Sequence, residues 1–318
     1  MTALLPARQE PPEYEPSGYE PPDLDSIPAP QWQDDDTPPA WRYFLSSALV
    51  VLATVLLGLT VHVTAVSYLV HESKQRAGMD ALRVDLARAT APVGQVRDGR
   101  LLPLGTPVAV LRIPALRVDE VVFEGTTGGV LMAGPGHQRD SALPGQAGTA
   151  IIMGRTASYA GPFRDLRRLV PDDRITVLTG QGEATYRVTG SRRAGDAVPP
   201  PVAPGAGRLT LVTAAGAPFL PEGLLRVDAE LVSPPQPSPP RPLRPGSISP
   251  QELPLAGDTS SLWTLVMGLQ GLVAAAAGAV WSRHRWGVVR TWIVFVPLVA
   301  VFGLLVAEQT VRLLPNLL

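Results

Sequence analysis

The chain of 318 residues has a formal net charge of -1, and 45% of its residues are hydrophobic. Its length allows about two domains of ordinary size. The near-zero charge gives no electrostatic argument for binding nucleic acid. The chain contains no cysteine, so disulfides, thiolate metal sites and a cysteine nucleophile are excluded, while the redox compartment stays open.

Residues 1–40 predict a disordered tail. The segment is rich in proline and contains the acidic run Asp34–Asp36. Too few apolar residues are present to offset the entropy of ordering the chain. It also lacks the basic region followed by an apolar stretch that marks a secretory signal. We expect a solvated tail, with a short docking motif as the open alternative.

Three apolar segments, 44–66, 261–281 and 291–311, predict three transmembrane helices, because each is long enough to cross a bilayer. The short loop between the last two carries three arginines, which predicts a cytoplasmic loop. Three crossings then place the 1–40 tail in the cytoplasm and the globular part outside it. The basic residues after the first helix argue for the reverse, but the segment that they begin is long, and long domains translocate largely regardless of charge.

The chain between the first and second apolar segments divides into three parts. Residues 68–100 predict a helical juxtamembrane stalk, because Met79, Leu82 and Leu86 recur at helical spacing. Residues 101–232 form the globular part. The proline-rich residues 233–257 predict an extended linker back to the membrane.

The globular part alternates short β-type runs with Gly/Pro turns. This pattern predicts a mainly β fold, a barrel of about seven or eight strands. Short helices are expected at 126–132 and 162–170, the second opened by a proline suited to a first helical turn. The strand-like runs are 108–114, 118–125, 148–154, 174–180, 184–193, 208–213 and 224–232.

An ordered series of segments carries a family resemblance. It reads "VAVLRIPALRVDEVVFEGT", "GPGHQRDSALPGQAG", "AIIMGRTASYAGPFRDLRRL", "ATYRVTGS", "RLTLVTA" and "VDAELV". The series, over residues 104–232, resembles the extracytoplasmic sortases of actinobacteria, especially the class E type. The resemblance implies a membrane-anchored β-barrel transpeptidase that cleaves a C-terminal sorting motif and joins the protein to an amine through a thioester on cysteine.

The resemblance also implies where the catalytic residues of the family would fall. The histidine follows the glycine of an "I-x-G-H-R" segment, and "IMGRT" places Arg155 there. The cysteine closes the strand "LTLVTA" and falls on Ala214. The arginine falls on Leu224 when the last strand is aligned through "AEL", and Arg226, two residues on, is the alternative.

These substitutions change the chemistry of the implied site. Alanine has no atom that can attack a carbonyl, and the Arg155 guanidinium only donates hydrogen bonds and keeps its proton at physiological pH. Thr213 points to the opposite face of the strand from Ala214. Thr210 shares that face but lies about 13 Å away at the usual strand rise.

The sequence offers few other residues that could act as nucleophiles or ligands. Ser158 and Thr156 follow Arg155, but each would need an adjacent base. His137, the one histidine of the globular part, is interpreted as structural or surface-exposed, with Asp140 as a loop partner at best. No residue set predicts a metal ion or cofactor, because no Cys/His cluster has ligand spacing and no glycine run fits a phosphate loop.

The sequence therefore predicts a multi-pass membrane protein with an extracytoplasmic sortase-like barrel that has lost its catalytic set, a pseudoenzyme. Its expected role is to bind a peptide or protein partner at the cell envelope, beside the lipid bilayer. Two alternatives stay open. One is a residual transpeptidase or hydrolase with a non-cysteine nucleophile. The other is a structural membrane component in which the barrel is a spacer.

Overall fold

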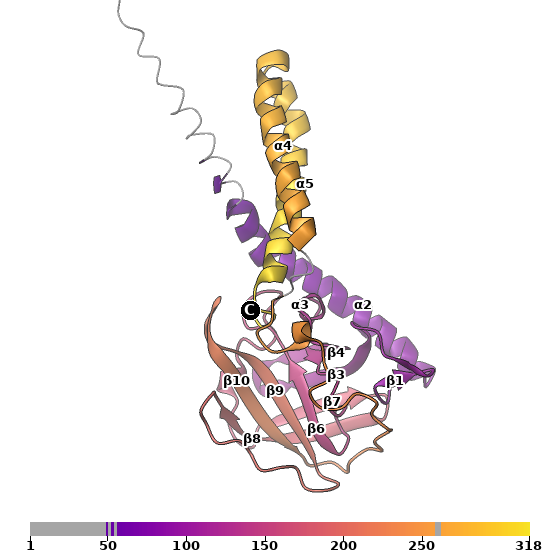
Figure 1. Cartoon of the computed structure of the whole chain (residues 1–318). Helices are drawn as coiled ribbons and strands as arrows, with labels where there is room; N and C mark the ends of the chain where they lie inside the picture. Colours follow the sequence, from indigo (N-terminus) through magenta and orange to yellow (C-terminus); the bar gives the residue numbers. More distant parts are fainter. Residues whose placement is uncertain (1–48, 50–51, 54–55, 258–261) are drawn as a thin grey trace, which may run out of the picture. The chain divides into compact units, whose positions relative to one another are not determined.

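Eight strands close into a β-barrel (Figure 1). The structure, a computed structural model, describes residues 49, 52–53, 56–257 and 262–318. The order around the barrel is β10-β8-β7-β3-β4-β5-β6-β9, which confirms the predicted mainly β barrel. The strands are β3 (Pro107–Ile113), β4 (Val118–Glu124), β5 (Gly136–His137), β6 (Gly148–Met153), β7 (Arg174–Thr179), β8 (Gly182–Arg192), β9 (Gly207–Ala217) and β10 (Leu220–Leu231).

The period-two pattern of each strand decides which side chains fill the barrel. In β9, Leu209 and Leu211 belong to the main buried core, while Val212 and Ala214 belong to a separate buried cluster. Successive side chains of a strand point to opposite faces. One face of β9 therefore lines the barrel interior, and the other face carries Ala214 on the outside of the barrel.

Three short elements depart from the prediction. β1 (Val96–Arg97), β2 (Arg100–Leu101) and β5 are two-residue strands, too short to show a period in the sequence. The helix predicted at 162–170 is only a 3₁₀ turn, η4 (Leu166–Arg168), because its amides bond to carbonyls three residues earlier. The helix predicted at 126–132 forms as α3 (Gly128–Leu131) and is capped by the Thr127 side chain.

The helix α2 (Ser67–Ala87) continues from the π-helical turn η2 (His62–Val66) and packs on the barrel. The Gln75 amide group donates to the carbonyl oxygen of Val121 at 3.1 Å and accepts from its N–H at 2.7 Å. Leu82, one of the three predicted apolar positions, is buried. The helical part of the predicted stalk therefore lies against β4.

Two helices in the described residues are long and apolar enough to cross a membrane, rather than the predicted three. They are α4 (Leu262–Trp286) and α5 (Val288–Leu313), which lie side by side (Figure 1). Small residues of α4 allow the close approach, since a β-carbon on Gly278 would lie 2.8 Å from the Phe295 ring. The predicted tail 1–40 and part of the predicted segment 44–66 fall outside the described residues.

The proline-rich residues 233–257 are bonded to the barrel surface along their length. The Gln236 N–H donates to the Gly145 carbonyl at 2.8 Å, and the Leu243 N–H donates to the Gln95 side chain at 3.0 Å.

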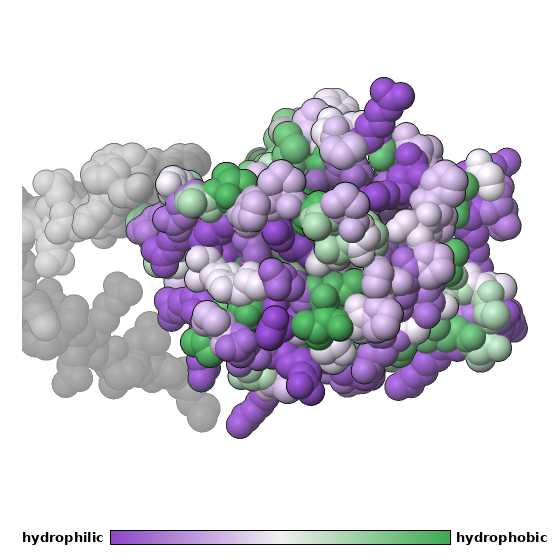
Figure 2. Space-filling view, turned by 90° about the horizontal axis from the view of Figure 1, so that it is seen from below, coloured by the Kyte–Doolittle hydropathy of each residue, from purple (hydrophilic) through white to green (hydrophobic). Residues whose placement is uncertain are grey.

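The face of the barrel shown in Figure 2 is mostly hydrophilic, with a small hydrophobic area near its middle.

Gly136 in β5 is expected to be sensitive to a side chain. A β-carbon there would overlap the carbonyl oxygen of Gly125, whereas one on Gly129 would meet nothing within 4 Å. We predict that Gly136→Ala lowers the free energy of unfolding by about 1–3 kcal/mol and that Gly129→Ala does not lower it. Thermal unfolding followed by the circular dichroism of the buried tyrosines measures both. Equal losses in the two variants would contradict the tight fit of β5.

Candidate functional site

Three strands present one outer face around Ala214. Leu224 of β10 lies directly opposite Ala214 of β9, and Arg226 lies opposite Val212. Val212 in turn pairs with Met153 of β6. Paired residues of neighbouring strands share a face. Arg226 therefore lies on the same face as Ala214, two residues along β10 from Leu224.

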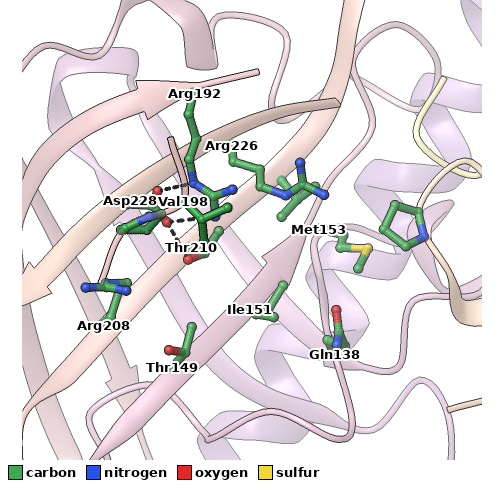
Figure 3. A pocket seen from close by; sticks show the side chains of 13 residues that line it. Gln138, Thr149, Ile151, Met153, Arg192, Val198, Arg208, Thr210, Arg226 and Asp228 are labelled. Atoms are coloured by element: carbon green, nitrogen blue, oxygen red, sulfur yellow. Dashed lines mark hydrogen bonds and ion pairs between the residues drawn. The ribbon is translucent and has the colours of Figure 1, made fainter. Parts of the chain in front are cut away.

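A cavity of about 230 Å³ lies along this face (Figure 3). Its lining includes Arg226 and Asp228 of β10, Arg192 of β8 and Arg208 of β9. Asp228 accepts from Arg192 Nε at 2.6 Å and from the Thr210 hydroxyl at 2.7 Å. Burial and the nearby Arg192 charge lower the pKa of Arg226, while Asp228 opposes this effect. With three arginines and one carboxylate in its wall, the cavity favours an anionic group.

Arg155 is fully buried just after the end of β6. Its Nη1 atom donates to Ser158 Oγ at 3.0 Å and to the backbone oxygen of Leu318 at 2.8 Å. Its Nη2 atom donates to the Gly128 carbonyl at 3.1 Å, and its guanidinium lies 5.2 Å from the centre of the Tyr159 ring.

Burial lowers the pKa of Arg155 to about 10, and the neighbouring Tyr159 works against this shift. At physiological pH the side chain therefore stays protonated and offers donors only. Among the described residues, no Asp or Glu forms an ion pair with it. The chemistry at this position is hydrogen-bond donation to oxygen atoms, not proton abstraction.

Two residues that the sequence does not single out, Leu317 and Leu318, contact both Ala214 and Arg155. Ala214 is 5% exposed and belongs to a buried cluster that includes Leu317 and Leu318. Arg155 donates to the Leu318 backbone oxygen. No local signal marks residues 317–318, because their partners lie more than 100 residues earlier in the chain.

His137 is buried in a polar network inside the barrel wall. Its Nδ1 atom lies 2.8 Å from Glu124 Oε2, and its Nε2 atom lies 2.9 Å from the Ala142 carbonyl. Burial alone lowers the pKa of His137, but the Glu124 charge and hydrogen bond and the Ala142 carbonyl outweigh it, and the net shift is upward. Both ring nitrogens therefore serve as donors, as in an imidazolium.

The Ser141 hydroxyl lies 3.1 Å from His137 Nε2, so that Ser141, His137 and Glu124 stand in the order of a catalytic triad. However, Nε2 faces the Ala142 carbonyl, and the Ser141 hydroxyl donates to the Gln138 carbonyl at 2.7 Å. The imidazole has no free lone pair to accept the serine proton. The arrangement is a structural network, which agrees with the structural interpretation of His137 and not with the surface one.

The remaining candidates lack a base as well. Ser158 Oγ donates to the Leu318 backbone oxygen at 2.5 Å. Thr156 and Thr213 share a hydrogen bond of 2.8 Å, and Thr213 also donates to the Gly154 carbonyl. Asp140 accepts hydrogen bonds from the Gln138 side chain and the Gly246 N–H, and its charge contributes to the upward shift of the His137 pKa. Within residues 56–257 and 262–318, no three His, Cys, Asp or Glu side chains could share a metal ion.

Comparisons with known proteins agree on one family. Residues 111–219 match the model of the sortase domain. Sortase D of Bacillus subtilis strain 168 is 30% identical over 84 residues, which cover 26% of this chain and 41% of that protein. The matched segment thus spans less than half the length of this curated relative.

Solved structures give the same family name. A mutant of sortase E from Streptomyces avermitilis is 31% identical, with a TM-score of 0.36, and the match covers 42% of this chain and 93% of that chain. Sortase C of Clostridium perfringens, solved with the C-terminal cell wall sorting motif, is 17% identical, with a TM-score of 0.39, and the match covers 51% and 89%. Residues 111–219 therefore carry a sortase domain.

The His137 network predicts a pH dependence of stability. The folded pKa is raised above the ordinary value of 6.5, so the folded state binds more protons than the unfolded state. The stabilisation is complete below pH 6.5 and is lost as the pH rises through the folded pKa. Urea unfolding at a series of pH values should show this decline, and His137→Gln should remove it. An equal decline in that variant would show that another group is responsible.

Proposed function

We propose that this protein is a non-catalytic, membrane-anchored sortase-domain protein whose barrel binds a peptide or protein segment at the cell envelope. The observation that carries the proposal is that a groove is present while the two implied catalytic positions hold other residues. The groove keeps about 230 Å³ beside Arg226. Ala214 and Arg155 stand where the family resemblance puts the nucleophile and the acid/base residue.

The absence of a nucleophile supports the lack of transpeptidase activity. The sequence contains no cysteine at all, and acyl transfer through a thioester needs a thiolate. Ser158 hydrogen-bonds to Arg155 and to the Leu318 backbone oxygen, and Thr156 hydrogen-bonds to Thr213 and to the Ala214 carbonyl. In the part of the chain that the structure describes, these partners include no His, Asp or Glu side chain. These contacts weigh against a residual hydrolase.

The two apolar helices support the membrane location. They form a hairpin, so both of their outer ends lie on one side of any bilayer that they cross. The Asn316 N–H donates to the Ala256 carbonyl at 2.9 Å, which joins the residue after α5 to the residues before α4. We assign three spans and an extracytoplasmic barrel as part of the proposal. The third span is the apolar segment 44–66, and the orientation rests on Arg283, Arg285 and Arg290, which lie where α4 meets α5. This arrangement keeps the barrel close to the membrane surface.

The proposal predicts binding without turnover. The full chain in detergent micelles, incubated with a fluorescent sorting-motif peptide and an amine acceptor, should release no product, while a cysteine-bearing sortase serves as the positive control. Anisotropy of the same peptide should show saturable binding. We expect Arg226→Ala to weaken binding about tenfold or more, because hydrogen bonds to charged groups are the stronger class.

Arg112→Ala is the matched control, since this arginine is exposed on β3 and does not line the cavity at Arg226. It should leave binding unchanged. Product formation that disappears in Ser158→Ala would establish the residual-enzyme alternative. The absence of any peptide binding by the unmodified chain would favour the barrel as a spacer.

A further inference from the structure

Residues 315–318, which follow α5, are buried against the barrel. Asn316 and Leu317 have no exposed surface, and Leu318 is 3% exposed. The Thr156 N–H donates to the Leu317 backbone oxygen at 2.9 Å. The Asn316 side-chain amide donates to the Thr126 carbonyl at 2.8 Å. The segment therefore has backbone and side-chain partners on two separate parts of the barrel domain.

The same segment covers both substituted catalytic positions. Arg155 and Ser158 donate to the Leu318 backbone oxygen at 2.8 Å and 2.5 Å. The side chains of Leu317 and Leu318 belong to the buried apolar cluster that contains Ala214. The Ala214 side chain is a methyl group, and it supplies an apolar contact for the two leucine side chains.

The buried charge of Arg155 explains why the segment is needed. A buried cation is costly unless hydrogen bonds to oxygen atoms compensate it. The Arg155 Nε atom already has no partner among the described residues, and the Leu318 oxygen is one of only three oxygens that the guanidinium contacts there. Loss of the segment would leave Nη1 with the Ser158 hydroxyl as its one remaining partner.

We propose that Arg155, Ser158, the Thr156 N–H and Ala214 form a peptide-binding site whose ligand is this chain's own 315–318 segment. The site takes an apolar peptide and holds it by two successive backbone oxygens. Because the segment continues directly from α5, its release requires the end of that helix to move. The arginine-lined cavity at Arg226 stays open beside it. That a partner peptide must displace the segment to reach Ala214 rests on the function proposed above.

Thiol labelling tests the occupancy directly, since the chain has no native cysteine. Leu317→Cys, in the full chain in detergent micelles, supplies a single reporter on the segment. We expect a maleimide to label it at least about tenfold more slowly than Leu104→Cys, an exposed position. Adding Arg155→Ala should speed labelling of Leu317→Cys about tenfold or more.

Three further variants make the result decisive. Ser158→Ala removes only one donor to Leu318, so its effect should be smaller than that of Arg155→Ala. Arg168→Ala, an exposed arginine that lines the cavities at neither Arg226 nor Ala214, should have no effect. Ala184→Cys, fully buried inside the barrel, should stay unlabelled in the Arg155→Ala background. If Ala184→Cys labels, Arg155→Ala has opened the barrel itself. The labelling rate of Leu317→Cys in the Ser158→Ala background then decides whether the segment is held at this site, because that variant keeps the arginine.

A hexapeptide with the sequence of residues 313–318 should compete for the site and speed labelling of Leu317→Cys saturably, while a scrambled peptide should not. Fast labelling of Leu317→Cys in the otherwise unchanged chain would overturn the proposal, and so would a rate insensitive to both Arg155→Ala and Ser158→Ala. No partner is present in these measurements. Slow labelling together with failed binding of sorting-motif peptides would therefore reject the proposed function and leave this site standing.

Discussion

The buried guanidinium of Arg155 is the constraint on which the arrangement of the site depends. Burying a cation is costly unless oxygen atoms surround it, and here they come from Gly128, Ser158 and Leu318. These three contacts tie the end of β6 to α3 and to the residues after α5. The side chain therefore joins the barrel to the helical hairpin through hydrogen bonds rather than through apolar packing alone.

The groove has two regions that differ in polarity and exposure. On one side, Ala214 packs with Leu317 and Leu318 in a buried apolar cluster, and it also lines a second cavity, of about 310 Å³, with Thr156 and Arg164. Around Arg226 the groove is open and lined by three arginines and one carboxylate. A catalytic site would need its reacting atoms accessible to substrate and a base within hydrogen-bond reach. Among the described residues, the hydrogen-bond partners of Arg155, Thr156 and Ser158 include no His, Asp or Glu side chain, while Arg226 lies in the wall of the open cavity.

Much of the barrel could be predicted from the sequence, because strands such as β9 and β10 carry the period-two pattern that decides which face is buried. The register that sets Leu224 opposite Ala214 was not predicted, because the alignment of strand endings does not say which residues of two strands pair. β5 escaped prediction because two residues have no period, and the helix at 162–170 was predicted wrongly because a suitable first proline does not ensure continuation beyond a 3₁₀ turn. The contact of Arg155 with Leu318 is set by the meeting of distant segments, and no local pattern encodes such a contact.

Amide exchange around Thr156 tests the central claim most directly, because its N–H donates to Leu317 in the folded chain. Exchange should be slow in chain fragments that contain Thr156, and removal of Leu317 and Leu318 should make it fast there while the barrel strands β7 and β8 keep their protection. The same exchange rate at Thr156 with and without these two residues would contradict the account.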